Sequence, residues 1–143
     1  MVSWLHLTYK MPRKPSSPRV KVWRKLKSLG SFHLHDAIWL LPNNVYTYEQ
    51  FQWLTVEIKD LGGEATMWES QLHFGLSDKE IRQLFIEQIN ESYIELLKQL
   101  DGENIDLISL SKKYQRIKRI DYFKSPVELK VREKIIQQRS ELK

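Results

Sequence analysis

The order of hydrophobic periods along the first part of the chain is the feature that most constrains the fold. Three stretches have the pattern of strands: residues 4–9, 31–41 and 64–69. Apolar and polar residues alternate in them, except that residues 37–41 form an unbroken apolar run, as in a more buried strand. Apolar residues recur every three to four positions, as in amphipathic helices, in two stretches between them: residues 18–29 and 51–61. We expect the middle extended stretch to turn or bulge at His35-Asp36 and so to provide two strands.

The resulting order, β-α-β-β-α-β, predicts an α+β fold of the ferredoxin-like plan, with two helices on one face of an antiparallel sheet. Capping residues indicate where the helices begin. Ser17 is a suitable N-cap, with Pro18 at the first helical position. Thr47 to Gln50 has the pattern of a capping box, with Tyr46 and Phe51 as its hydrophobic staple.

The second half of the chain predicts three helices. The first follows a capping box at Ser77 to Glu80, and the second lies between about Asp106 and Ile120. The third begins at the segment 125–128 (Ser-Pro-Val-Glu), with proline at the first helical position. We therefore expect a ferredoxin-like domain at residues 1–76 and a helical extension at 77–143, packed together as one structural unit.

Composition excludes several classes of protein. The 143 residues include no cysteine, so disulfides, thiolate metal sites and sulfur redox chemistry are excluded. The longest apolar run, Ala37 to Leu41, is far too short for a membrane span, and the N-terminus does not resemble a signal peptide. We expect a soluble, cytoplasmic protein that does not contact a membrane.

Charge is segregated along the chain. Residues 1–41 carry a net charge of +7, residues 42–111 carry −9, and residues 112–143 carry +7. Basic segments favour a polyanionic partner, because a cation close to a phosphate releases condensed counterions. The alternative is a solvated surface on which the oppositely charged segments pair in the fold.

The first basic segment is the strongest candidate for a binding site. Val22, Leu26 and Leu29 form the predicted buried stripe of its helix, so most of the cations fall elsewhere. Prolines stiffen the preceding loop, and a helix N-terminus suits phosphate. An ordinary solvated helix face is the alternative. The candidate nucleic-acid-binding residues are Lys10, Arg13, Lys14, Arg19, Lys21, Arg24, Lys25 and Lys27.

Three other groups of residues favour structural interpretations. A second basic cluster lies at Lys112, Lys113, Arg116, Lys118 and Arg119. It could extend the same binding surface, but we expect it to pair with the acidic helix or to be solvated. His33 and His35, two apart on a strand, could hold a metal with Asp36 or His6, but a polar sheet face explains them equally well. The tryptophans are interpreted as packing residues; they are Trp4, Trp23, Trp39, Trp53 and Trp68.

No pattern in the sequence indicates catalysis. The chain contains no Walker loop, no dinucleotide fingerprint and no Gly-x-Ser-x-Gly motif. We therefore expect no catalytic residue, no cofactor and no bound metal.

Several segments, taken together, resemble the N-terminal region of the ChrB family of chromate-resistance regulators. They are residues 4–13, 18–20, 23–26, 29–30, 36–42, 62–66 and 119–123. This resemblance implies a DNA-binding regulatory module that acts near chromate-resistance genes. In the family, this region commonly precedes a second domain linked to the chromate response.

The early segment is also similar, more distantly, to the central domain of PaaX-type repressors. That domain in turn resembles a small CRISPR adaptation endonuclease of the ferredoxin-like plan, which carries a metal-binding acid where its first strand ends. Here the corresponding residues are Tyr9, Lys10 and Met11, none of which suits Mg²⁺, so nuclease activity is not implied.

The sequence thus predicts a DNA-binding transcription regulator that acts as a dimer. One alternative is a non-enzymatic protein-interaction or dimerisation module, which would use the long amphipathic helix from Ser77 to Leu100. A second is an enzyme acting on an oxyanion such as chromate, which the absence of cysteine and of a cofactor motif disfavours.

Overall fold

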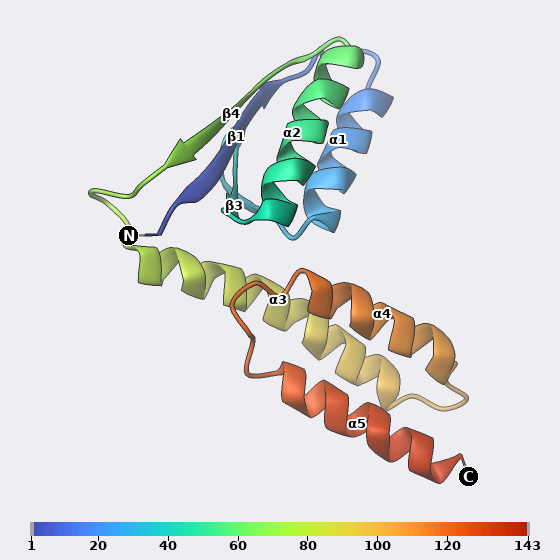
Figure 1. The fold of residues 1–143 in the computed structure, drawn as a ribbon. Coiled ribbons are helices and arrows are strands. Elements are labelled where there is room, and N and C mark those ends of the chain that lie inside the picture. The colour runs from blue at the N-terminus through green and yellow to red at the C-terminus, as the bar shows by residue number, and fades with distance from the viewer. Residues whose placement is uncertain (1, 143) are drawn as a thin grey trace. The chain divides into compact units, whose positions relative to one another are not determined.

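The protein divides into two compact units in a computed structural model that describes residues 2–142. The units are Met1–Asp78 and Lys79–Lys143. The first contains all the strands and two helices, and the second contains helices alone (Figure 1). That the two halves pack as one structural unit stays a prediction.

The first unit is a four-stranded antiparallel sheet covered by two helices. Its strands are β1 (Trp4–Lys10), β2 (Phe32–His35), β3 (Ile38–Pro42) and β4 (Glu64–Ser70), in the spatial order β2-β3-β1-β4. Helices α1 (Ser17–Ser28) and α2 (Val45–Asp60) lie on the same side of this sheet (Figure 1). The predicted α+β class is therefore confirmed.

The core of this unit lies between the helices and the sheet. Leu5 and Leu7 of β1 are fully buried, as the alternation in the sequence predicted. The predicted stripe of α1 is confirmed as well, since Val22, Leu26 and Leu29 are 3% exposed or less. Burial of each such side chain contributes roughly 1.5–3 kcal/mol. These contacts fix which side of α1 faces the sheet.

Both helices begin earlier than their capping signals predicted. The N-cap of α1 is Ser16, which makes no side-chain cap bond, so the assignment of Ser17 is wrong and Pro18 lies one position further inside. The N-cap of α2 is Asn44. Its Oδ1 accepts from the Thr47 backbone N–H at 2.9 Å, and the Thr47 Oγ1 accepts from the Asn44 N–H at 3.0 Å.

The capping box predicted at Thr47 to Gln50 is therefore wrong, because Thr47 is the third residue of the helix. The physical reason is the short turn after β3. It leaves Asn44 extended, with φ −144° and ψ 174°, at the point where the helix starts. Thr47 is buried, and its hydroxyl also donates to the Pro42 carbonyl.

Close approach of two backbones fixes the end of β1. Gly63 precedes β4, and a Cβ built on it would lie 2.6 Å from the Lys10 carbonyl oxygen and 2.3 Å from the Met11 sulfur. No side chain fits in this space. The glycine therefore lets the start of β4 lie directly against the residues at which the basic loop, residues 11–16, begins.

The second unit consists of α3 (Asp78–Leu100), α4 (Leu107–Arg119) and α5 (Glu128–Glu141). The predicted helix between Asp106 and Ile120 is confirmed, with Asp106 as its N-cap. The last helix begins later than predicted. Its N-cap is Val127, so Pro126 precedes the helix rather than opening it.

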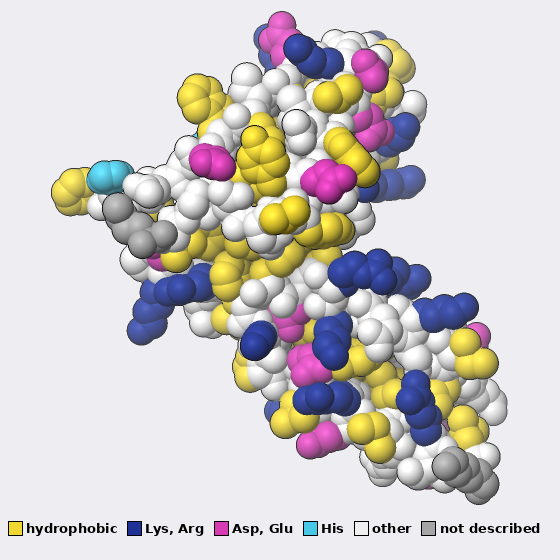
Figure 2. Space-filling model, in the orientation of Figure 1, with side chains coloured by type: hydrophobic (Ala, Val, Ile, Leu, Met, Phe, Trp, Pro, Cys, Tyr) yellow, Lys and Arg dark blue, Asp and Glu magenta, His cyan; other side chains and the backbone are white. Residues whose placement is uncertain are grey.

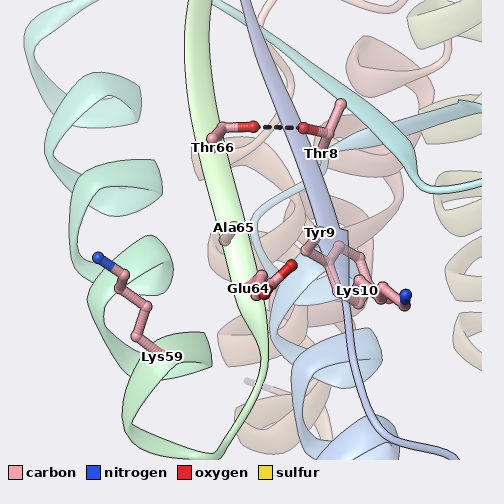
Figure 3. A pocket seen from close by; sticks show the side chains of 7 residues that line it. All are labelled: Thr8, Tyr9, Lys10, Lys59, Glu64, Ala65 and Thr66. Atoms are coloured by element: carbon pink, nitrogen blue, oxygen red, sulfur yellow. Dashed lines mark hydrogen bonds between the residues drawn. The ribbon is translucent and has the colours of Figure 1, made fainter.

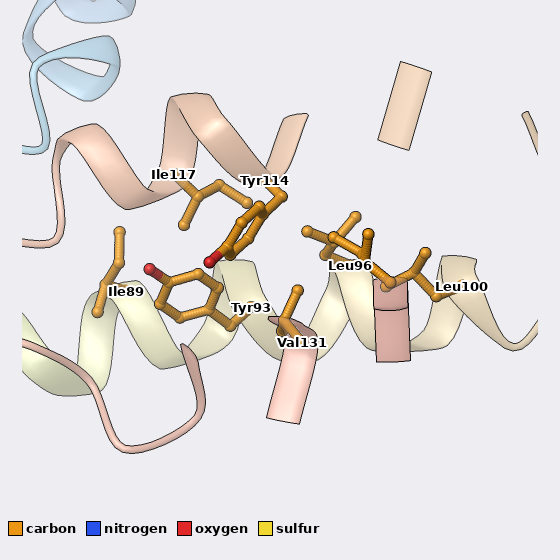
Figure 4. Close-up of a cluster of buried hydrophobic side chains, with 8 residues drawn as sticks. Ile89, Tyr93, Leu96, Leu100, Tyr114, Ile117 and Val131 are labelled. Atoms are coloured by element: carbon orange, nitrogen blue, oxygen red, sulfur yellow. The ribbon is translucent and has the colours of Figure 1, made fainter. Parts of the chain in front are cut away.

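The core of the second unit combines apolar side chains with two tyrosines (Figure 4). Its buried members are Ile89, Tyr93, Leu96, Leu100, Tyr114, Ile117, Val131 and Ile135. The Tyr93 hydroxyl donates to Asp121 Oδ2 at 2.9 Å, and the Tyr114 hydroxyl donates to Glu128. Burial first, and then these carboxylates, raise the pKa of both phenols, that of Tyr114 to about 12.

The raised pKa of Tyr93 makes the stability of the second unit sensitive to alkali. An unfolded tyrosine has a pKa near 10, so the contribution of this phenol is complete below about pH 10 and is lost as the pH rises further. We expect Tyr93→Phe to lower the free energy of unfolding by roughly 1–3 kcal/mol at pH 8. The difference from the wild type should shrink above pH 10.

Urea unfolding followed by circular dichroism at pH 8 and pH 11 measures this difference. Tyr48→Phe, on the exposed side of α2, is the control and should change little at either pH. A stability gap between wild type and Tyr93→Phe that stays constant across this range would contradict the assignment.

Candidate nucleic-acid interface

All eight candidate cations are exposed. Lys10 ends β1, and Arg13 and Lys14 lie in the basic loop. The remaining five lie on α1 and are called the basic ridge: Arg19, Lys21, Arg24, Lys25 and Lys27. Figure 2 shows dark blue side chains along the edge of the molecule where Figure 1 places α1.

The five cations of the basic ridge are spread around the solvent-exposed side of α1, here called its outer arc. Because Val22 and Leu26 face the core, helical geometry places Arg24 near the centre of the exposed side. Lys21 and Lys25 lie on the flank nearer α2, and Arg19 and Lys27 lie on the other flank. The cations therefore form two flanks and, between them, a crest at Arg24, rather than one flat patch.

One acidic contact neutralises part of the ridge. The Lys21 Nζ lies 3.2 Å from Glu57 Oε1 of α2. Within residues 2–142, none of the other seven cations has a carboxylate within 4.0 Å. The pairing of oppositely charged segments that the sequence left open thus involves Lys21, and an exposed pair of this kind contributes at most about 1 kcal/mol.

The Arg19 end of the ridge lies near Tyr9 of the sheet. Tyr9 of β1 is partly buried, and burial raises its pKa. The Arg19 guanidinium and a hydrogen bond with Trp39 act in the opposite direction. Arg19 is therefore close to the sheet, on the flank of α1 away from Lys21.

The interpretation of all five tryptophans as packing residues is wrong for three of them. Trp4 and Trp39 are 2% exposed, whereas Trp23, Trp53 and Trp68 are 48%, 61% and 58% exposed. Trp23 lies on the Arg19 flank of α1, and the Lys27 Nζ is 5.6 Å from its ring centroid. The signal that the sequence offered was the spacing: cations occupy the positions four residues before and after Trp23.

The second basic cluster lies on α4 and is mainly solvated. Lys113 donates to Gln99 Oε1 at 2.9 Å, and the Lys118 Nζ lies 5.8 Å from the Tyr114 ring centroid. Within residues 2–142, no cation of this cluster has a carboxylate within 4.0 Å. Of the two expectations for this cluster, solvation describes it and pairing with the acidic helix does not.

The two histidines of β2 cannot act as a chelating pair. A bulge separates them, so His33 is paired with Trp39 while His35 is paired with Ile38, the next residue of β3. Neighbouring residues on a strand face opposite sides, and the bulge therefore turns the two rings apart. The His33 ring instead stacks on Trp39, with centroids 4.4 Å apart.

The predicted change of direction at His35-Asp36 is confirmed as a turn, with Asp36 at φ 47°, whereas the bulge lies earlier, between His33 and His35. The expectation that both rings share one side is wrong. His6, the other proposed ligand, has a lowered pKa because of burial and, secondarily, His35. In the part of the chain that the structure describes, no group of three or more histidine or acidic side chains could hold a metal ion.

An open hollow of about 510 Å³ lies where β1 ends and β4 begins (Figure 3). The Thr8 and Thr66 hydroxyls meet across the two strands at 2.6 Å. Lys10 and Lys59 contribute the cations and Glu64 the carboxylate. Lys59 was missed by the sequence reasoning because it belongs to the acidic middle segment, and only the fold brings α2 beside β4.

These features define an α+β protein whose first helix presents an exposed basic ridge. No helix in the described part of the chain has the length and apolar character to cross a membrane. The chain belongs to the family described as Protein ChrB, N-terminal, whose model matches residues 19–118. The resemblance stated from the sequence is thereby confirmed.

A curated relative gives the extent of this similarity. The chain is 26% identical to Protein ChrB of Cupriavidus metallidurans over an alignment that covers 85% of this chain and 40% of that protein. The chain thus spans about two-fifths of the length of this relative. No solved structure matches the chain.

Proposed function

We propose that this chain is the DNA-contacting module of a transcription regulator linked to chromate resistance, and that it is not an enzyme. Membership of the ChrB N-terminal family supports the link to such a regulator. The observation that carries the proposal is the basic ridge, four of whose five cations have no acidic partner within residues 2–142.

We also propose that the first unit follows the ferredoxin-like plan. The strand order β2-β3-β1-β4, the antiparallel pairing and the two helices on one face support it. This arrangement matters for the function because the helices shield one face of the sheet. The outer arc of α1 is then left to meet a partner.

Binding through the ridge would be mainly electrostatic. The helical rise separates Arg19 from Lys27 by about 12 Å, which spans several phosphates of a DNA strand. Arg13 and Lys14 of the basic loop would extend the contact beyond the helix N-terminus. Contacts of this kind position a protein on a duplex without reading its sequence.

Removing ridge charges should weaken DNA binding and its salt dependence together. We expect the triple variant Arg13→Gln, Arg24→Gln, Lys25→Gln to lose on the order of tenfold or more in affinity for a duplex at low salt. Each lost phosphate contact should also reduce the slope of log K against log salt by about 0.9. Fluorescence anisotropy across a salt series measures both quantities.

The matched control removes three exposed cations from α4 with Lys112→Gln, Arg116→Gln and Arg119→Gln. It changes the net charge by the same amount and should leave most of the affinity intact. Equal losses in the two variants would show that net charge alone matters. Undetectable binding of the wild type to any duplex at low salt would overturn the proposal.

Glu57 should weaken DNA binding, because its carboxylate lies 3.2 Å from the Lys21 Nζ and competes with phosphate for this cation. We expect Glu57→Gln to raise the affinity for a duplex a few-fold. It should also steepen the slope of log K against log salt by up to about 0.9, the value for one phosphate contact. Glu49→Gln, two turns earlier on α2, is the control for a general loss of negative charge. Equal effects of the two substitutions would show that Lys21 does not contact the DNA.

A second candidate function, dimerisation or another protein interaction, is supported by the outer face of α2. Val45, Tyr48, Trp53 and Val56 are 88%, 43%, 61% and 56% exposed there. Such a face is unusual for a helix that otherwise buries Phe51 and its neighbours. The sequence suggested the amphipathic helix α3 for this role, but the buried apolar residues of α3 from Ile89 to Leu100 belong to the core of the second unit.

Val56→Glu tests this candidate, because a charge in the centre of the face should prevent association of two copies. We expect sedimentation velocity to show a dimer for the wild type at micromolar concentration and a monomer for the variant. Ile108→Glu, at an apolar position of α4 that is 73% exposed, is the control. A wild type that stays monomeric would reject the dimer.

A further inference from the structure

Trp23 is the largest exposed apolar side chain on α1, where Val20 is also 42% exposed. Val22 and Leu26, which face the sheet, are 1% exposed or less, whereas Trp23 leaves 48% of its surface in solvent. A half-exposed indole ring is a flat apolar surface that water solvates poorly. Its environment therefore indicates what kind of group could cover it.

Two cations flank this ring. Arg19 and Lys27 lie one helical turn before and after Trp23, on the same side of α1. The Lys27 Nζ is 5.6 Å from the ring centroid, within the range of a cation–π contact. Within residues 2–142, neither cation has a carboxylate within 4.0 Å. Both positive charges are thus available to an anion that lies beside the ring.

A second aromatic group lies on the sheet near Arg19. Arg19 is close to Tyr9, which shares a hydrogen bond with Trp39. On Trp39 stacks the exposed His33 ring, with the two planes inclined by 9°. Beyond Arg19 and Tyr9 the sheet therefore presents a further exposed ring, that of His33, whose Nε2 bonds to the backbone oxygen of the exposed Asp36.

Trp53 shows that an exposed tryptophan alone does not create such a site. It is more exposed than Trp23, at 61%, and it also lies on a helix of the first unit. Its neighbours at the same spacing are Glu49 and Glu57. Phosphates would be attracted to the surroundings of Trp23 and repelled from those of Trp53.

We propose that Trp23 stacks on an unpaired nucleobase while Arg19 and Lys27 bind the phosphates on either side of it. This inference rests on the proposed function and adds to it a preference for single-stranded or locally opened DNA. In an intact duplex the faces of the bases are covered by their neighbours, so only an unpaired base can stack on the ring. Stacking of this kind does not depend on the base sequence.

The experiment compares three labelled ligands of equal length by fluorescence anisotropy: single-stranded oligo-dT, a duplex, and an abasic strand with the same phosphates. We expect the wild type to bind oligo-dT on the order of tenfold more tightly than the abasic strand. Trp23→Ala should remove this difference and leave the affinity for the abasic strand unchanged. Trp23→Phe, which keeps a smaller ring, should retain part of the difference.

Trp53→Ala is the matched control and should leave the ratio of the two affinities unchanged. A Trp23→Ala variant that keeps the preference for oligo-dT, or that loses affinity for all three ligands equally, would overturn the inference. Circular dichroism checks that each variant is folded. If Trp23→Ala does not fold, the affinity ratio of Trp23→Phe tests the inference instead. The proposed function fails separately, through the absence of any binding by the wild type at low salt.

Discussion

The rotation of α1 about its own axis is the constraint on which the rest of the first unit depends. Val22 and Leu26 are buried against the sheet, and turning the helix by one residue would expose them and bring a lysine or a tryptophan inward. The burial that stabilises the helix therefore also selects the side chains that meet solvent. The position of each cation in the basic ridge follows from this orientation of the helix.

The two helices share one face of the sheet, yet their outer surfaces differ in charge. The outer side of α1 is basic, and that of α2 combines apolar residues with acids. They meet in one ion pair, between Lys21 and Glu57. Because this contact lies on one flank of α1, the crest and the opposite flank keep their charge. Trp23 lies on that opposite flank, where an aromatic surface and free cations occur together.

Periodicity predicted the order of the elements and the buried stripe of α1, since both depend on local pattern. It did not locate the start of α2, because Asn44 and Thr47 are both capping residues and only the end of β3 decides between them. It placed His33 and His35 on one side, because a bulge adds a residue that alternation cannot count. It also missed the exposure of Trp23, which lies at the margin of the stripe, where neighbouring elements decide burial.

The absence of a side chain at Gly63 has a consequence for the basic loop. The hydrogen atom at this position is what allows the Lys10 carbonyl and Met11 to lie against the start of β4. Any larger residue would push apart the strand end from which Arg13 and Lys14 extend. The geometry of a positively charged loop thus depends on a neutral residue in the acidic segment, some fifty positions later in the chain. Substitutions far from every cation could in this way displace the surface that carries them.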